Sequence, residues 1–366
     1  MGFKCGIVGM PNVGKSTLFN ALTSTAAAQA ANYPFCTIEP NVGMVAVPDA
    51  RLNNLANIAK SAKIIPTQLE FVDIAGLVKG ASKGEGLGNQ FLSHIREVDA
   101  VVYVLRCFEN DDIIHVEGSI DPLRDWEIIE TELILADLES LEKRIPNLEK
   151  RLKTDDKEAK EQLSLIQRIK PILEAGKPGR NVEIKEEEKR AYRLLQLLTT
   201  KPVLYVCNVS EDDAASGNKF TQLVAEHAKK ENAESVIISA RIEEEVAGLD
   251  SDEEKKEFLG ALGLSETGLS KIIRAGYKLL NLRTFFTVGP KEARAWTVRI
   301  GAKAPEAAGV IHTDFQKGFI CADTIAYQDY TGLNGEQGAK DAGKLRQEGK
   351  EYTVQDGDVF HFKFNV

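Results

Sequence analysis

Short apolar runs separated by helical patterns recur along the chain. Three runs hardly alternate with polar residues: Phe3–Val8, Ala100–Cys107 and Pro202–Cys207. Strands that are apolar on both faces are typical of a parallel sheet covered by helices on both sides. Further strands are predicted at Asn41–Val47, Gln68–Val72 and Ser235–Ser239, and intervening helices at Ala50–Ala62, Asn89–Glu97 and Phe220–Lys230. The pattern therefore predicts a doubly wound α/β domain.

Between residues 126 and 199 the pattern becomes that of long, charged helices. Apolar residues step by four and three, as in a coiled-coil seam: Ile134, Leu138, Leu141, Ile145, Leu148 and Leu152. A turn at Lys153–Asp156 would lead to a returning helix that ends near Gly176–Gly179 and is lined by Leu163, Ile166, Ile169 and Leu173. An antiparallel helical hairpin is predicted, in which Pro146 should kink its helix or point away from the partner helix. Solvation is the simpler explanation of the charged faces, and recognition of a partner stays open.

The last part of the chain consists of short strand-like pieces separated by glycine-containing turns. The pieces are Phe285–Val288, Ala295–Ile300, Phe319–Asp323, Tyr352–Val354 and Val359–Val366. They indicate a small, mostly β, ubiquitin-like module. The predicted organisation is an α/β domain in two parts, residues 1–125 and 200–280, a helical insertion at 126–199, and a C-terminal module at 281–366.

Composition narrows the possible functions. With 366 residues and 43% hydrophobic content the chain can bury a substantial core, and no apolar run approaches the ~18 to 20 residues that cross a bilayer. We expect a cytoplasmic protein without an export signal or a membrane partner. A net charge of -9 argues against broad, non-specific nucleic-acid binding, although a local basic patch remains possible. The cysteines are odd in number and scattered, which favours buried thiols.

The strongest chemical signal is Gly9–Ser16, which matches G-x-x-x-x-G-K-[ST] between a strand and a helix. Glycines at the two ends of such a loop let successive amides converge on phosphate oxygens. Lys15 would neutralise phosphate charge in catalysis, and the Ser16 hydroxyl would ligate Mg²⁺. A glycine-rich turn that binds nothing has no need of lysine followed by serine. The expected nucleotide-binding residues of the loop are Asn12, Val13, Gly14, Lys15, Ser16 and Thr17.

A second phosphate-site motif, D-x-x-G, follows at Asp73–Gly76. Asp73 would reach Mg²⁺ through water, and the Gly76 amide would face the terminal phosphate. Together with Asn32–Thr37, Lys79–Gly88, Asn208–Glu211, the insertion and the C-terminal module, these motifs make the whole chain resemble the Obg-like ATPases of the YchF subfamily.

The resemblance implies a translation-factor-type P-loop domain with a coiled-coil insertion and a C-terminal TGS domain. It also implies that Thr37 completes the magnesium site, that Asn208 bonds the adenine edge and that Val209 lies beside the ring. Association with the ribosome is a further implication, and contact with RNA stays open. His115 would be a catalytic residue carried to the site by a moving switch, although a solvated loop is the simpler explanation of a lone histidine.

The residues expected to contact the base indicate whether the chain prefers ATP or GTP. GTP-specific relatives use N-K-x-D, whose aspartate accepts two hydrogens from guanine. Here the strand is followed by Asn208-Val-Ser-Glu211, which lacks the lysine and carries the longer glutamate. The resemblance implies a preference for adenine, whereas a degenerate guanine reader is the alternative.

Hydrolysis is expected to be slow. The residue after the D-x-x-G motif is Leu77, where Ras-type proteins place a glutamine that orients water. Asn12 matches the loop asparagine of relatives in which K⁺ supplies extra charge, so a potassium requirement is a hypothesis. The leading prediction is a magnesium-dependent ATPase switch; a GTP-driven translation factor and a module that uses ATP only as a structural ligand are the rivals.

Overall fold

The computed structural model describes residues 3–30, 41–74, 87–110, 118–249 and 251–365. Its first sheet has six strands in the order β2-β4-β1-β5-β6-β7. All neighbouring strands run parallel except β2, which is antiparallel to β4. The bounds are β1 Lys4–Val8, β2 Val42–Ala46, β4 Gln68–Asp73, β5 Ala100–Arg106, β6 Val203–Asn208 and β7 Glu234–Ile238. Every residue of β5 and β6 is buried, as their uninterrupted apolar runs predict.

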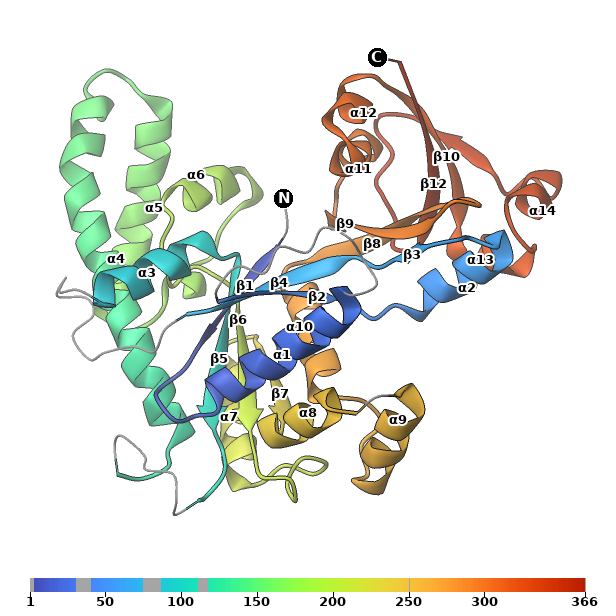
Figure 1. The fold of residues 1–366 in the computed structure, drawn as a ribbon. Coiled ribbons are helices and arrows are strands. Elements are labelled where there is room, and N and C mark those ends of the chain that lie inside the picture. The colour runs from blue at the N-terminus through green and yellow to red at the C-terminus, as the bar shows by residue number, and fades with distance from the viewer. Residues whose placement is uncertain (1–2, 31–40, 75–86, 111–117, 250, 366) are drawn as a thin grey trace.

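Helices pack around this sheet and enclose one large apolar core (Figure 1). They are α1 Lys15–Ala30, α3 Leu87–Glu97, α7 Lys219–Lys230, α8 Ala240–Ala247, α9 Asp252–Ala261 and α10 Gly268–Leu279. The doubly wound α/β prediction is confirmed, whereas α8, α9 and α10 were not predicted. Among the described residues, no helix combines the length and the apolar character of a bilayer span.

The insertion is a helical hairpin made of α4, Pro122–Leu152, and α5, Lys157–Glu174. Its seam is buried or partly buried except at one end, where the Leu152 side chain is exposed. Pro146 is exposed within a helix that continues past it, so it points away from the partner helix. After α5 the chain forms η2 Gly179–Asn181, η3 Glu186–Glu188 and α6 Lys189–Leu194, which add Ala191 and Leu195 to the hairpin core.

Buried charges join the base of the hairpin to the sheet. Arg180 pairs with Glu130 of α4 at 2.6 Å and with Glu231, next to α7, at 2.9 Å. Tyr103 of β5 and Tyr205 of β6 donate hydrogen bonds to these two carboxylates. The hairpin is thereby anchored to the strands that it separates in the sequence.

A single carboxylate holds the chain where it returns to the sheet. Asp137 of α4 accepts bonds from the Leu198 amide at 2.8 Å, the Thr199 amide at 2.8 Å and the Thr199 hydroxyl at 2.7 Å. Burial nevertheless raises the pKa of Asp137 to about 6. The hydrogen bonds therefore offset only part of the cost of desolvating the carboxylate.

The C-terminal module contains a second six-stranded sheet, ordered β11-β10-β12-β8-β9-β3. The strands are β3 Ile64–Ile65, β8 Leu282–Val288, β9 Ala293–Arg299, β10 Phe319–Ala326, β11 Arg346–Glu348 and β12 Asp358–Phe364. A β-rich module is thus confirmed. The predicted strand at Tyr352–Val354 is wrong, because that segment makes only an isolated bridge at Thr353. Four short helices were not predicted: α11 Ala304–Ile311, α12 Thr313–Lys317, α13 Tyr327–Gly332 and α14 Glu336–Asp341.

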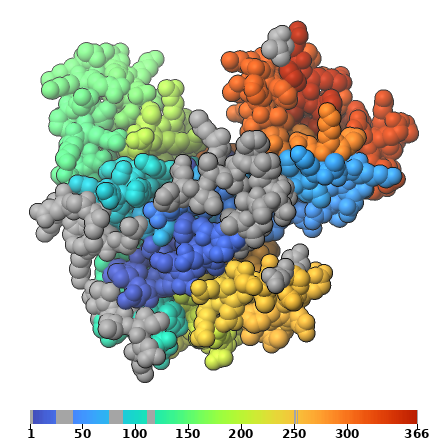
Figure 2. All heavy atoms as spheres, in the orientation of Figure 1, coloured from blue at the N-terminus to red at the C-terminus, as the bar shows by residue number. Residues whose placement is uncertain are grey.

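An early segment of the chain also belongs to this second sheet. Helix α2, Ala50–Ala59, buries Leu52 and Leu55 against Phe286 and neighbouring side chains of the module, and β3 pairs in parallel with β9. The prediction that Ala50–Ala62 is an intervening helix of the first sheet is therefore wrong. Figure 2 shows the hairpin and the C-terminal module as separate lobes on the same side of the α/β domain.

The described cysteines are structural thiols. Cys5, Cys107 and Cys207 are buried, Cys321 is partly buried, and all four are free. Burial raises the pKa of the Cys5 thiol to about 12. Contact with Cys207, together with burial, raises the pKa of Cys107 as well. Such thiols are poor nucleophiles, which agrees with the sequence-based expectation for them.

Candidate nucleotide-binding site

The loop Gly9–Ser16 lies between the end of β1 and the head of α1, as its motif predicts. Asn12 and Gly14 have φ values of 62° and 88° and so adopt the left-handed conformation. A Cβ on Gly14 would lie 2.2 Å from Asn208 Nδ2, and one on Gly9 would lie 2.7 Å from the Val104 carbonyl oxygen. Glycine is therefore required at both positions for close backbone approach, and at Gly14 for its dihedral as well.

Asn208, at the end of β6, holds this loop against the sheet. Its Nδ2 donates to the Val13 carbonyl oxygen at 2.9 Å, and its Oδ1 accepts from the Ala240 amide at 2.9 Å. The buried side chain thus joins the loop, β6 and the first turn of α8. Both atom groups that would read an adenine edge already bind the protein. The adenine contact of Asn208 stays a prediction, and the role seen in the structure is that of a clamp.

The phosphate end of the site carries a pair of opposite charges. Lys15 forms an ion pair with Asp73, at the end of β4, while Ser16 is exposed in the first turn of α1. Together these side chains offer a hydroxyl and a carboxylate, the hard oxygen donors that suit Mg²⁺ completed by phosphate and water. No group of three His, Cys, Asp or Glu residues able to hold a metal occurs among the described residues. The donor set therefore fits a magnesium ion that arrives with a nucleotide.

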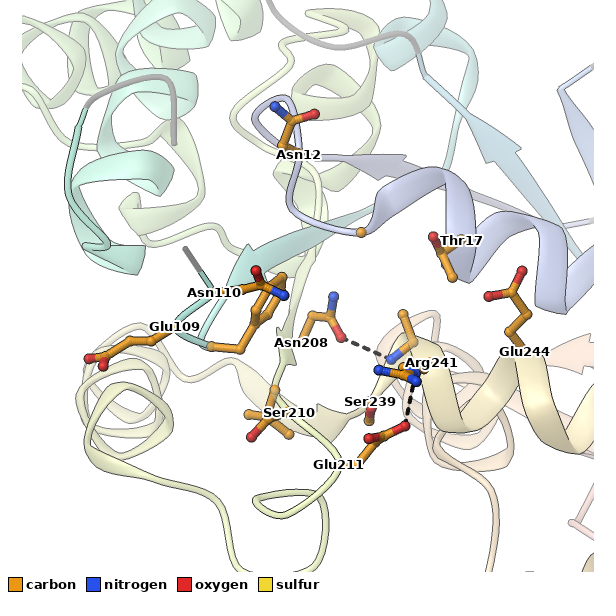
Figure 3. A pocket seen from close by; sticks show the side chains of 14 residues that line it. Asn12, Thr17, Glu109, Asn110, Asn208, Ser210, Glu211, Ser239, Arg241 and Glu244 are labelled. Carbon is orange, nitrogen blue, oxygen red and sulfur yellow. Dashed lines mark hydrogen bonds and ion pairs between the residues drawn. The ribbon is translucent and has the colours of Figure 1, made fainter. Parts of the chain in front are cut away.

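A cavity of about 540 Å³ opens beside the loop (Figure 3). Six of the expected nucleotide-binding residues reach its wall: Asn12, Gly14, Thr17, Asn208, Val209 and Glu211. Val13 is buried, so it could contribute only through its backbone. Lys15 and Ser16 belong to the loop but do not line this cavity. The cavity thus extends from the phosphate-binding loop to the base-reading position.

More than half of the wall was missed from the sequence. The missed residues are Phe108, Glu109, Asn110, Ser210, Ser239, Ala240, Arg241 and Glu244. Most follow the carboxyl ends of β5, β6 and β7, where ligands of open α/β sheets gather. Their position directly after these strands was the signal by which they could have been predicted from the sequence. The Ser239 hydroxyl is buried here without a hydrogen-bond partner in the described part of the chain, so it lacks the partner that buried polar groups usually have.

Two exposed ion pairs flank the cavity. Arg241 Nε lies 3.0 Å from Glu211 Oε1, with side-chain exposures of 74% and 39%. Lys219 Nζ lies 2.9 Å from Glu109 Oε1, with exposures of 71% and 69%. In Figure 3 the Arg241–Glu211 pair lies below Asn208, at the start of α8. The carboxylate at the base-reading position is thus already engaged by a cation.

Several predicted site residues lie outside the described residues. These are Thr37, Gly76, Leu77 and His115, together with Asn32–Thr37 and most of Lys79–Gly88. Their roles stay predictions.

Comparisons with known proteins cover the full chain. A family model described as a 50S ribosome-binding GTPase matches residues 4–143, and the model YchF-GTPase_C, described as a protein of unknown function, matches residues 282–365. "Ribosome-binding ATPase YchF" from Haemophilus influenzae is 61% identical and covers 100% of both chains. Its namesake from Bacillus subtilis is 55% identical with the same coverage.

A solved structure agrees in fold. The Schizosaccharomyces pombe YchF GTPase matches with a TM-score of 0.88 and 41% identity, covering 99% of this chain and 98% of the other. The printed names differ on the nucleotide, since the bacterial relatives are called ATPases and the solved structure a GTPase. The names alone therefore leave the purine open.

Proposed function

This chain belongs to the YchF family of Obg-like ATPases, and on that premise we propose that it is a magnesium-dependent ATP-binding and ATP-hydrolysing switch protein. The observation that carries the proposal is the cavity between the phosphate-binding loop and the start of α8, which lacks the lysine and aspartate of a guanine reader. In the same proposal the protein works in the cytoplasm and binds ribosomes, as the names of its relatives suggest.

The residues have separate tasks in this proposal. Loop amides from Gly14 to Thr17 hold the phosphates at the head of α1, and Lys15 neutralises charge that develops during transfer. Ser16 and Asp73 hold Mg²⁺, for which Asp73 exchanges its ion pair with Lys15. The ion, when bound, neutralises charge on the outer phosphates. Thr37 and Gly76 complete this end of the site by family resemblance.

The base end is formed by other groups. Asn208 and Val209 contact adenine, and the free Ser239 hydroxyl offers a hydrogen bond to the nucleoside. Glu211 contributes a carboxylate that Arg241 already engages.

Turnover is slow in this proposal, because Leu77 has no polar atom with which to orient water. His115 supplies general acid–base chemistry, and K⁺ bound near Asn12 adds charge. Phosphate release measured in potassium and in sodium buffer tests whether hydrolysis requires K⁺. Equal rates in the two buffers would remove K⁺ from the mechanism. Replacement of His115 by alanine should lower kcat and leave ATP affinity intact.

The test of the proposal has two parts. ATP and GTP should compete for the purified chain with ATP bound at least about tenfold more tightly, measured by displacement of a fluorescent nucleotide. Lys15→Ala should then lower phosphate release by at least about 100-fold, since it removes a cation aimed at transition-state charge. Tighter binding of GTP would support a GTP-driven translation factor. Tight ATP binding without phosphate release would support a module that uses ATP as a structural ligand.

Binding of a partner is tested separately. The chain should sediment with ribosomal subunits in the presence of a non-hydrolysable ATP analogue and less with ADP. Treatment of the same fractions with ribonuclease would show whether RNA takes part. Absence from every ribosomal fraction would contradict the partner while leaving the ATPase proposal standing.

A further inference from the structure

A carboxylate at the base-reading position would ordinarily favour guanine, because guanine offers two N–H donors on its reading edge. Glu211 occupies this position and lines the cavity. We propose that Arg241 is a specificity-determining residue: its guanidinium holds the Glu211 carboxylate and so lowers the affinity for guanine nucleotides. This inference rests on the proposed function and concerns how the same site prefers ATP over GTP.

The structure fixes the backbone beside Arg241 relative to the base end of the site. Its neighbour Ala240 is fixed by the hydrogen bond of its amide to Asn208 Oδ1, at 2.9 Å. From this first turn of α8 the side chain extends to Glu211, with 3.0 Å between Nε and Oε1. Figure 3 shows both side chains in the cavity wall. The backbone under Arg241 is thus tied to the same asparagine that clamps the phosphate-binding loop.

The chemistry of the pair opposes guanine in two ways. A carboxylate engaged by a guanidinium is a weaker acceptor for the N–H groups of a base, since part of its charge and one of its oxygens are already used. A guanidinium also carries only donors, so it cannot replace the carboxylate as an acceptor for the N1–H and N2–H groups of guanine. Adenine presents an acceptor at N1 beside its exocyclic amine. It therefore gains less from a free carboxylate than guanine does, and the ion pair costs it less affinity.

The pair does not act through charge on the phosphates. Any attraction between Arg241 and the phosphate groups is common to ATP and GTP and cancels in the ratio of their affinities. The ratio therefore isolates the effect at the base. Exposed ion pairs are weak in water, and they become stronger where a bound base excludes the water. We therefore expect a moderate effect on the ratio of the two affinities.

A double-mutant cycle tests the proposal. Dissociation constants for non-hydrolysable ATP and GTP analogues would be measured by calorimetry on wild type, Arg241→Ala, Glu211→Ala and the double variant. Arg241→Ala should tighten GTP-analogue binding about fivefold and change ATP-analogue binding less than twofold. In the Glu211→Ala background the same substitution should leave the ratio unchanged.

Lys219→Ala is the matched control. Lys219 is as exposed as Arg241 and pairs with Glu109, which also lines the cavity but does not follow Asn208 at the reading position. Its removal should leave the ratio as in wild type. Arg241→Lys should give an intermediate ratio, because lysine keeps the charge and loses the planar fork.

The outcomes separate this inference from the proposed function. Wild-type preference for ATP with an unchanged ratio in Arg241→Ala overturns the inference alone. A ratio that still shifts in the Glu211→Ala background also overturns it, since Arg241 would then act without Glu211. A wild-type chain that binds neither analogue contradicts both.

Discussion

The base of the helical hairpin and the base-reading end of the nucleotide cavity each contain an arginine paired with carboxylates, yet the two regions differ in their access to water. Arg180 is 11% exposed and its partners Glu130 and Glu231 are 3% and 10% exposed. Arg241 is 74% exposed and Glu211 is 39% exposed. The same chemical pairing is therefore a structural anchor in one place and an adjustable recognition element in the other.

The reason for the difference is the cost of leaving one partner alone. A buried carboxylate without its cation cannot recover its hydration, so breaking the pair is expensive. An exposed carboxylate is rehydrated at once, so breaking the pair costs little folding stability. Changes at the hairpin base should thus appear in stability, whereas changes at the cavity should appear in nucleotide choice.

The largest expected effect comes from Arg180→Ala. It leaves Glu130 and Glu231 buried without a cation, which should lower the free energy of unfolding by about 3 to 5 kcal/mol. Urea unfolding followed by tryptophan fluorescence is suitable, because Trp126 lies against His227 beside this cluster, with ring centroids 4.1 Å apart. Arg241→Ala is the paired control and should cost less than about 1 kcal/mol. Similar losses in the two variants would contradict the comparison.

A smaller effect is expected from Gly14→Ala. The left-handed dihedral costs roughly 1 to 2 kcal/mol for alanine, and the new Cβ would meet Asn208 Nδ2. ATP binding should weaken at least tenfold as the loop is displaced. Gly176→Ala is matched in dihedral, with a φ of 72°, but meets nothing within 4 Å. Gly176→Ala should lose only the free energy of the unfavourable backbone dihedral. Equal loss of ATP binding in both variants would contradict the role of Asn208 as a clamp on the loop.

The next effect concerns pH and Asp137. Its folded pKa of about 6 lies above the ordinary aspartate pKa of 3.8, so this group contributes stability that is fully present below the unfolded pKa and is lost as pH rises through 6. The free energy of unfolding of wild type minus that of Asp137→Asn should therefore be about 1 kcal/mol larger at pH 5 than at pH 7.5. Chemical unfolding at the two pH values measures it. A difference of opposite sign would mean that the hydrogen bonds outweigh burial.

The smallest effect is expected on the outer face of the hairpin. Lys143 and Glu139 form an exposed pair one helical turn apart. Lys143→Ala should change the free energy of unfolding by at most about 0.5 kcal/mol, and less in high salt. A loss above 1 kcal/mol would show that exposure is a poor guide to the strength of pairs in this protein.

Features encoded in consecutive residues could be predicted from the sequence. The loop Gly9–Ser16 and the steps of four and three along α4 depend on neighbouring residues alone, and both form where they were expected. Arg241 could not be found in the same way. It reaches the cavity because β7 is adjacent to β6 in the sheet, and strand order is a property of the whole fold.

The sequence also did not predict which distant segments some elements pack against. A helix was predicted at Ala50–Ala62 and α2 forms there, but the sequence pattern does not specify which sheet covers its Leu52 and Leu55 side chains. Tyr352–Val354 has the composition of a strand and lacks a neighbour to pair with beyond one bridge. Both errors concern contacts between distant parts of the chain, which local propensity cannot supply.

The early segment that joins the C-terminal sheet has a consequence for biosynthesis. Ser61 donates a hydrogen bond to the Gly289 carbonyl oxygen, 228 positions later in the chain. During translation α2 and β3 must therefore wait, with their apolar side chains uncovered, until nearly the whole polypeptide has emerged. Contacts of such long range slow folding. A separately expressed fragment that begins at residue 282 would lack a strand and a helix of its own core.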